Sequence, residues 1–395
     1  MKPDLHYAES LARWQRMALI VGLVAAALSA AAWYLAPDQF YPAYLVTFLF
    51  WLGLSLGCLA ISLLHHLTGG GWGIPIRRIV ESAASVLPLL AVLFLPLVLG
   101  METLYPWANA ETVAGDEILQ RKEHYLNVEF FLLRAAIYFA IWIVASLAMN
   151  ALTGHPGVRE QQSRQRALAL VSGPGLVLWG LCVTFAAIDW AMSLEPHWFS
   201  SMYGVLFVGG QAVSGFSLSV IVAVLLRRYP ASVNVLTTAR LHDLGNFLLA
   251  FVMFWSYVSF MQFLIIWSAN LPEETPYYLR RSEGGWQYIV GLLMGVHFLL
   301  PFLLLLIRPM KRNAWRLLGI AVLLLVMRFV DLCWLTLPKF SERLFVPWPL
   351  LVTMPAVGGL WLAAFSWRLS VRGPLPVHEF PDLETSDELA HSASH

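Results

Sequence analysis

The chain has 395 residues, of which 59% are apolar and 12% are charged, whereas charged residues make up roughly 25% of an average soluble domain. This composition excludes an ordinary soluble enzyme, and the net charge of +1 gives no indication of a nucleic-acid partner. The three cysteines fall inside predicted membrane spans and form no CxxC or CxxCH motif. The sequence therefore predicts neither attached haem c nor a cysteine-bound iron–sulfur cluster.

Apolar runs of about 20 residues or more recur along the whole chain, and each is long enough to cross a bilayer. The sequence predicts an all-α integral membrane protein with ten transmembrane helices and no separate soluble domain. The predicted spans are residues 15–36, 41–66, 77–100, 127–152, 168–194, 199–227, 242–269, 285–307, 314–337 and 347–370.

The two ends of the chain are polar, so the ten-helix domain is predicted over residues 15–372. Residues 1–14 show no cleavable signal peptide, and we expect the first span to remain as an anchor. Residues 373–395 are acidic and contain Pro and Ser, which predicts a disordered tail.

Most of the 25 Lys and Arg residues lie on one side of the predicted membrane. They occupy the N-terminus, the loops after spans two, four, six and eight, and the C-terminus. On that side are Lys2, Arg13, Arg16, Arg77, Arg78, Arg159, Arg164, Arg166, Arg227, Arg228, Arg240, Arg308, Lys311, Arg312, Arg316, Arg368 and Arg372. The positive-inside rule then predicts that both termini are cytoplasmic, in agreement with an even number of spans.

A weak internal repeat relates spans two and three to spans six and seven. Spans two and six both carry glycines before a cluster of His or Arg, and spans three and seven both begin with basic residues followed by an acid. The pattern favours two parallel four-helix bundles, spans 2–5 and 6–9, flanked by spans one and ten. Chance similarity explains the same residues equally well.

The outer loop at residues 101–126 is the longest on its side and contains five acidic residues, Glu102, Glu111, Asp116, Glu117 and Glu123. We expect this loop to cap the outer face or to dock a partner.

The stretch at residues 242–274, HDLGNFLLAFVMFWSYVSFMQFLIIWSANLPEE, combines a membrane-length apolar run with internal polar groups. Tyr257, Ser259 and Gln262 lie inside that run, and each costs free energy in hydrocarbon unless a neighbouring helix or water satisfies it. The stretch therefore predicts a bundle with a polar interior.

Ionisable and polar residues within spans are rare and usually face an interior cavity. A chain of acids, His and Tyr is able to pass protons because its members both accept and donate them. The candidates for a proton path are Glu81, Asp189, His197, Asp243, Tyr257, Gln262, His297, Arg328 and Asp331. The alternative is structural, with Arg328–Asp331 as a buried ion pair and Asp189 as the counter-charge of an Arg.

A quinone head group needs only an apolar slot and one or two polar side chains near an interface. Asp189, His197 and Gln262 on the outer side supply such groups, although a chain without any quinone site fits the sequence equally well. His65 and His66 are adjacent and point about 100° apart on a helix, so they do not predict a haem b clamp. No metal site is predicted.

Three blocks carry a family resemblance: HHLTGGGWG (residues 65–73), AIDWAMSLEPHWFSSMYG (residues 187–204) and the stretch at residues 242–274. With these blocks the chain resembles the second NrfD-like membrane subunit of bacterial alternative complex III, a quinol:cytochrome c (or other acceptor) oxidoreductase of the bacterial inner membrane. The resemblance implies ten helices, two four-helix bundles and no bound redox cofactor, with quinol and lipids nearby. Asp189, His197, Asp243 and Gln262 fall within the matching blocks.

The resemblance also implies partners: a homologous NrfD-like membrane subunit, an iron–sulfur protein related to molybdopterin oxidoreductases, c-type cytochromes and, in some complexes, a terminal oxidase. In that family the homologous subunit is the better candidate for quinol oxidation, and the present type is thought to offer a proton path.

Three functions remain open at the level of sequence. The chain is a proton-conducting or quinone-facing subunit of a respiratory oxidoreductase, or it is an anchor that orients redox partners through its loops. A solute carrier ranks last, because the hints of discontinuous helices are limited to Gly291, Gly295 and Pro301.

Overall fold

The computed structural model describes residues 5–153, 161–229 and 235–372. Within these residues every regular element is a helix, and ten helical segments are long and apolar enough to cross a membrane. The predicted all-α membrane fold with ten spans is confirmed. The acidic tail predicted at residues 373–395 lies outside the described residues.

Five of the ten spans are single α-helices that extend beyond a predicted boundary, and three more are single helices within the predicted bounds. These eight are α1 (Leu5–Leu35), α2 (Pro37–Thr68), α9 (Val128–Leu152), α10 (Gln161–Trp190), α11 (Tyr203–Leu226), α13 (Thr238–Ala269), α18 (Ala314–Thr336) and α19 (Leu350–Arg372). The third span is divided into α3 (Arg77–Ala84), α4 (Leu87–Val92) and α5 (Leu95–Leu99). The eighth comprises α15 (Trp286–Leu292), the π-helix η5 (Leu293–Leu299) and α16 (Leu300–Leu306).

Short helices connect the spans. They are η1 (Gly71–Gly73), α6 (Met101–Leu104), η2 (Pro106–Ala108), α7 (Ala110–Ala114), α8 (Glu117–Lys122), η4 (Met192–Leu194), α14 (Thr275–Arg281), α17 (Arg308–Arg312) and η6 (Leu337–Lys339).

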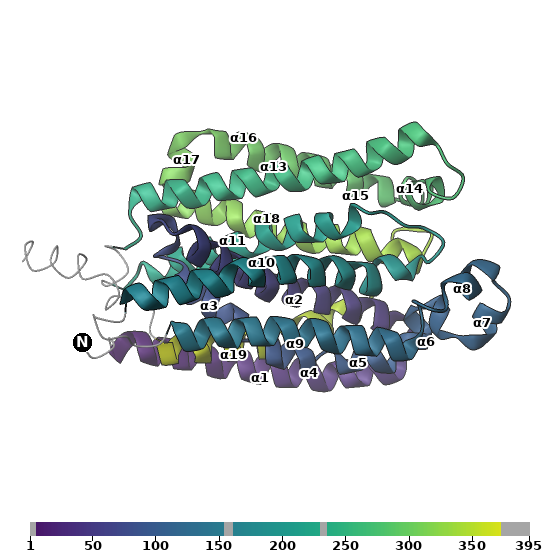
Figure 1. Ribbon diagram of the computed structural model, residues 1–395, viewed down its shortest axis with the longest axis horizontal. Coiled ribbons are helices and arrows are strands. Elements are labelled where there is room, and N and C mark those ends of the chain that lie inside the picture. The colour runs from purple at the N-terminus through teal and green to yellow at the C-terminus, as the bar shows by residue number, and fades with distance from the viewer. Residues whose placement is uncertain (1–4, 154–160, 230–234, 373–395) are drawn as a thin grey trace, which may run out of the picture.

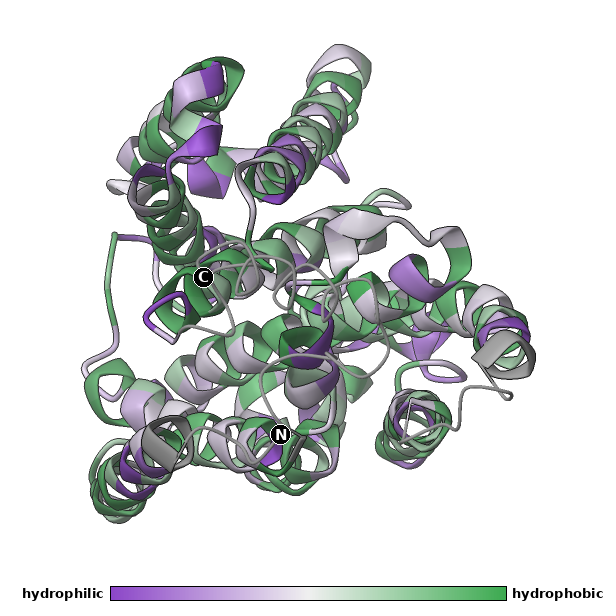
Figure 2. Ribbon diagram, turned by 90° about the vertical axis from the view of Figure 1, so that its left-hand side faces the viewer, coloured by the Kyte–Doolittle hydropathy of each residue, from purple (hydrophilic) through white to green (hydrophobic). Residues whose placement is uncertain are grey.

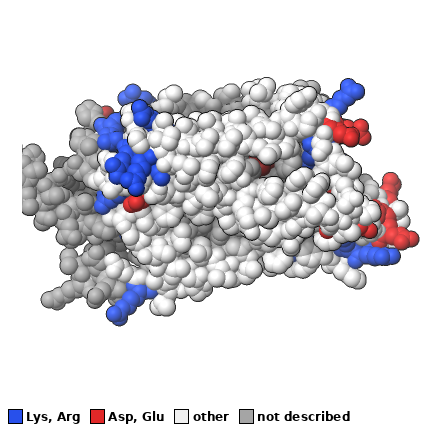
Figure 3. All heavy atoms as spheres, turned by 90° about the horizontal axis from the view of Figure 1, so that it is seen from above, with Lys and Arg blue, Asp and Glu red and all other residues white. Residues whose placement is uncertain are grey.

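The start of α1 and the end of α19 lie at the same end of the molecule (Figure 1). We call this the basic end, because α3 and α17 place Arg77, Arg78, Arg308, Lys311 and Arg312 there. The opposite end, which carries α6, α7, α8 and α14, is called the acidic end. On the face shown in Figure 3, Lys and Arg gather at the basic end, and an almost uncharged belt separates them from the acids. Viewed from the basic end, the helices run nearly toward the reader and are mostly hydrophobic along their length (Figure 2).

Helix α2 is the centre of the fold and is buried along nearly all of its length. It packs against α3, α10, α11, α18 and α19. A helix that is apolar on all sides belongs in such a position. Its few polar side chains join neighbours: Ser55 Oγ donates to the Ala83 carbonyl at 3.0 Å and accepts from Trp361 Nε1 at 2.8 Å. These bonds satisfy polar groups that would otherwise be unpaired in hydrocarbon.

Small residues let α2 and α11 approach closely. A Cβ on Gly57 would lie 2.0 Å from the Gln211 carbonyl oxygen, and a Cβ on Gly215 would lie 2.7 Å from the Gly57 carbonyl carbon. Both obstacles are backbone atoms, which cannot rotate away. The crossing therefore depends on glycine, as at many membrane helix contacts.

Close packing at glycine also joins the first and last spans. A Cβ on Gly22 of α1 would meet the Leu360 amide nitrogen of α19 at 2.7 Å, and a Cβ on Gly359 would meet Gly22 Cα at 2.5 Å. Helices α1 and α19 form an extensive pair on the flank of the molecule. The grouping of spans 2–5 and 6–9 into two four-helix bundles stays a prediction.

Proline explains the divided third span. Pro88 and Pro96 have no N–H group and so remove helical hydrogen bonds. The Tyr44 hydroxyl of α2 donates to the Leu93 carbonyl at 2.7 Å, which satisfies one acceptor at the second break. A neighbouring helix thus compensates an irregular backbone within the membrane.

The predicted outer loop is folded rather than extended, with α6, η2, α7 and α8 projecting from the acidic end (Figure 1). Asn109, Asp116 and Asn127 cap α7, α8 and α9 by accepting from amides in the first turn of each helix.

Replacement of Gly57 tests the α2–α11 crossing. Gly57→Ala should lower the stability of the purified chain in detergent by about 2 kcal/mol, because overpacking against fixed backbone forces the helices apart. The matched control is Gly319→Ala in α18, where a Cβ meets nothing within 4 Å. Thermal unfolding followed by circular dichroism measures both, and equal midpoints for the two variants would contradict the crossing.

Candidate functional site

Buried charged side chains lie at three depths in the described residues. The basic-end cluster is His66, Arg77, Arg78 and Glu81. The central cluster is Gln211, Trp255, His297, Arg328 and Asp331. Near the acidic end are the Arg134–Asp189 pair and the Glu195–Arg280–Arg281 group.

The basic-end cluster is organised around Glu81, which is 2% exposed. Its carboxylate accepts from Arg77 Nε at 3.0 Å and from Arg78 Nη1 at 3.2 Å, and His66 Nε2 lies 3.6 Å from Oε1. Both arginines lie within one turn of Glu81 on α3, so the helix itself brings the pair together. Glu81 therefore faces the interior as predicted, and cations of its own chain surround it.

Asp189 is fully buried at the end of α10. Arg134 of α9 donates through Nε to Oδ2 at 2.8 Å and through Nη2 to Oδ1 at 3.0 Å, and the Tyr138 hydroxyl donates to Oδ2 at 2.8 Å. All three partners are donors, and no acceptor faces the carboxyl among these contacts. This environment suits an ionised carboxylate, which only accepts. The geometry matches the structural alternative in which Asp189 is the counter-charge of an arginine.

The central cluster joins α18 to α13. Arg328 and Asp331 are one turn apart on α18 and form the predicted ion pair through Arg328 Nη1 and Asp331 Oδ2. Trp255 Nε1 of α13 donates to the same oxygen at 3.1 Å. The guanidinium occupies space over Gly210 of α11, where any Cβ would lie 2.2 Å from Arg328 Cζ. A side chain at position 210 would therefore force the Arg328 guanidinium to move from this position.

His297 completes the central cluster from η5. Its ring stacks on Trp255 with centroids 4.0 Å apart, and the side chain is fully buried. Neither ring nitrogen has a hydrogen-bond partner within the described part of the chain. Single π-helical turns are frequent at functional sites. His297 is therefore the titratable group of this cluster that retains both nitrogens for another partner.

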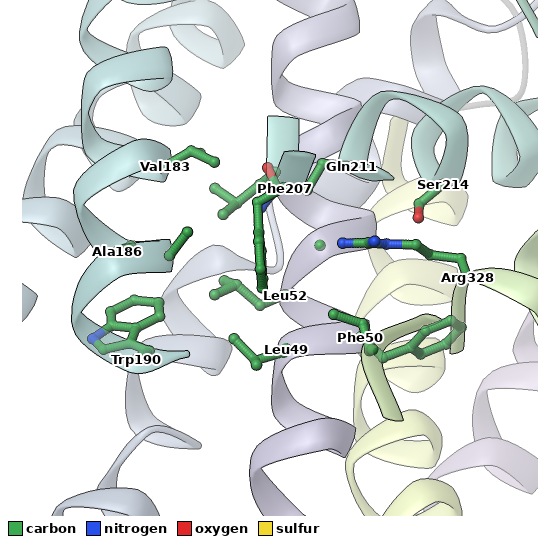
Figure 4. A pocket seen from close by; sticks show the side chains of 14 residues that line it. Leu49, Phe50, Leu52, Val183, Ala186, Trp190, Phe207, Gln211, Ser214 and Arg328 are labelled. Atoms are coloured by element: carbon green, nitrogen blue, oxygen red, sulfur yellow. The ribbon is translucent and has the colours of Figure 1, made fainter. Parts of the chain in front are cut away.

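A cavity of about 20 Å³ lies beside Arg328, at the level where α2, α10, α11 and α18 meet. Figure 4 shows the Arg328 side chain reaching toward Phe207, with Gln211 and Ser214 along the same wall. Gln211 Oε1 has no partner among the described residues. A cavity of this size holds about one water molecule when polar groups line it.

Two predicted path residues do not face the interior. Asp243 and Tyr257 are both exposed on α13, Tyr257 to 59%. The buried stripe of α13 runs through Leu244, Leu248 and Val252 to Trp255, and it places those two residues on the opposite side. The expectation of an interior position is wrong for both, because the apolar stripe and not the polar residues determines which face is buried.

The three residues proposed for a quinone site make separate contacts. Asp189 bonds Arg134 and Tyr138, whereas His197 Nε2 lies 2.7 Å from Asp116 Oδ2 at the exposed loops. Gln262 is buried and accepts from Ser200 Oγ at 3.1 Å while donating to the Tyr278 hydroxyl at 3.1 Å. Burial raises the pKa of Tyr278 to about 12, so this partner stays neutral. Among the described residues no contact joins the three side chains, and they do not fit a single head-group pocket.

Sequence reasoning noted Glu195 on the outer side but missed Trp255 and the two arginine partners of Glu195. Arg281 is fully buried and bonds Glu195 through Nη2 at 2.8 Å, while Arg280 Nη1 reaches the other oxygen at 2.9 Å. Burial opposes the charge of Arg281, but Tyr277 and Glu195 outweigh it and raise the Arg281 pKa. The adjacent Arg280-Arg281 pair in an otherwise acidic outer region was the available signal.

Within residues 5–153, 161–229 and 235–372, no group of three or more His, Cys, Asp or Glu side chains is arranged to hold a metal ion. Comparison with protein-family models and with curated proteins finds no match to this chain.

Removal of one partner tests the central ion pair. Arg328→Met should destabilise the chain by about 3–5 kcal/mol, because it leaves the Asp331 carboxylate buried without its cation. The double variant Arg328→Met/Asp331→Leu should recover most of that loss, since it removes both charges. Chemical unfolding in mixed micelles measures the two values. Equal destabilisation of the single and double variants would show that the charges do not interact.

Proposed function

We propose that this chain is a membrane subunit of a respiratory quinol:cytochrome c (or other acceptor) oxidoreductase of the alternative complex III type. In this proposal it spans the bacterial inner membrane, with the basic end and both termini in the cytoplasm. Its partners are a homologous NrfD-like subunit, an iron–sulfur subunit related to molybdopterin oxidoreductases and c-type cytochromes. The motifs at residues 65–73, 187–204 and 242–274 are the basis for this family assignment.

We propose further that the chain carries protons rather than electrons. The observation that carries this step is the central cluster, where His297, with both nitrogens unpartnered in the described structure, stacks on a Trp bonded to Asp331. A neutral imidazole accepts a proton at one nitrogen and donates from the other. The water-sized cavity beside Arg328 adjoins this central cluster, and the basic-end cluster around Glu81 lies at a further depth.

No step at a quinone is assigned to this chain. Asp189 offers no free oxygen to a head group, and His197 and Gln262 belong to other contacts. We propose that quinol oxidation occurs on the homologous partner subunit and that this chain supplies a neighbouring route for protons.

A second function, an anchor for the redox partners, is favoured by a specific observation. Glu81, Asp189, Glu195 and Asp331 are each paired with an arginine of the same chain. Such pairs also occur in purely structural helix contacts. The folded loop of α6, α7 and α8 then provides the outer docking surface.

Purification of the intact chain from its native membrane tests the family assignment. Haem c and iron–sulfur absorbance should co-purify with the chain in constant ratio. Isolation of the chain as a single homogeneous species without either chromophore, from membranes that contain both, would contradict the assignment.

Replacement of His297 distinguishes the proton-carrier function from the anchor function. In proteoliposomes of the whole complex, His297→Phe should slow proton translocation by at least about tenfold, while quinol oxidation under uncoupled conditions persists. Phenylalanine keeps the stacking on Trp255 and removes both nitrogens. Tyr257→Phe, on the exposed face of α13, is the control and should change neither rate. An unchanged ratio of protons to electrons in His297→Phe would leave the anchor function.

A further inference from the structure

A concentrated positive patch lies at the basic end, on the exposed side of α16, α17 and α18. We call it the α17 patch and define it as Arg308, Lys311 and Arg312 of α17 and Arg316 in the first turn of α18. The three arginines are exposed, and Lys311 is buried.

Lys311 fixes α17 against α13. Its aliphatic stem lies over Gly245, where a Cβ would meet Lys311 Cγ at 2.6 Å, and its Nζ donates to Asn246 Oδ1 at 2.6 Å. Burial, together with the neighbouring Arg308, lowers the pKa of Lys311. The short helix is therefore held in place by the fold, and the two arginines beside Lys311 have a defined position.

The charge of the patch is not neutralised within the described chain. None of its four cations makes an ion pair with a described Asp or Glu. Three cations, Lys311, Arg312 and Arg308, act electrostatically on the neighbouring His242 ring. Asp243 is the one acid among the charged groups that act on it. Like charges this close repel one another, so the patch is suited to a counter-anion from outside the chain.

An exposed apolar stripe continues from the patch into the membrane. On η5 and α16 it comprises Leu299, Leu303 and Leu306, which are 49%, 50% and 52% exposed. Trp315, 68% exposed, lies beside the patch at the level where Trp side chains mark the membrane–water interface. Figure 3 shows this junction of basic end and uncharged belt on the face that carries α13 and α16.

We propose that the α17 patch binds an anionic phospholipid, with the phosphate at Arg308 and Arg312 and an acyl chain along the leucine stripe. The combination of charge and apolar stripe selects this ligand. A free phosphate uses the cations alone, and a lipid without net charge gains less from them than an anionic one. Clusters of Lys and Arg on the cytoplasmic side of membrane helices recognise anionic lipids in this way. The inference is independent of the proposed redox complex and requires only a membrane.

The test is native mass spectrometry of the full chain in detergent, titrated with phosphatidylglycerol and, separately, phosphatidylcholine. Arg308→Gln/Arg312→Gln should weaken phosphatidylglycerol binding by about tenfold or more and leave phosphatidylcholine binding unchanged. The matched control, Arg227→Gln/Arg228→Gln, removes two charges from the same end of the molecule at α11. It should retain wild-type affinity.

A conservative variant, Arg308→Lys/Arg312→Lys, should keep the preference for phosphatidylglycerol, which shows that the glutamine variant loses binding and not folding. Equal losses in the glutamine variant and the α11 control would overturn the site in favour of a general surface charge. Displacement of the lipid by an equal concentration of inorganic phosphate would overturn the lipid and identify a simple anion site. Equal binding of the two lipids by the wild-type chain would also refute the proposal.

Discussion

The fold depends on how it keeps charged side chains inside hydrocarbon. An isolated charge there is expensive, and the usual remedies are a partner of opposite charge or a change of protonation. Here the partners are supplied by the chain. Glu81 has Arg77 and Arg78 on its own helix, Asp331 has Arg328, and Asp189 is held across two helices by Arg134 and Tyr138. The Arg134–Asp189 pair joins α9 to α10, and the Trp255–Asp331 hydrogen bond joins α13 to α18. The central helix α2 contacts α11 through glycine.

The spans could be predicted because the length and apolarity of a membrane helix are visible in the sequence. The ends of α9, α13 and α18 lie within a few residues of expectation, and the ion pair at Arg328 and Asp331 follows from spacing on one helix. The divided third span could not be predicted in detail, because prolines are tolerated in membrane helices. Only the position of Tyr44 on α2 shows which freed carbonyl is satisfied.

The site was harder to predict. The sequence shows how deep a residue lies along a helix, but it does not show which way the side chain points. Asp243 and Tyr257 have the expected depth but lie on the exposed face of α13. Trp255, on the buried face of the same helix, donates a hydrogen bond to Asp331 instead. The environment of Asp189 also depends on a contact between helices distant in sequence, because its partner Arg134 lies 55 positions earlier in the chain. Within the described residues, ion pairs lie near both ends and at the centre, and the central imidazole of His297 has no hydrogen-bond partner.

The central claim is that the buried Asp189 side chain serves as an acceptor for Arg134 and Tyr138, donors of the same chain that hold it in place. Infrared difference spectroscopy of the full chain against Asp189→Asn measures this directly. The account predicts that the variant loses the stretching bands of an ionised carboxylate and that no carbonyl band of a protonated carboxylic acid disappears with it. Loss of a protonated-acid band on that substitution would show that Asp189 escapes its burial cost by taking up a proton, and it would contradict the account.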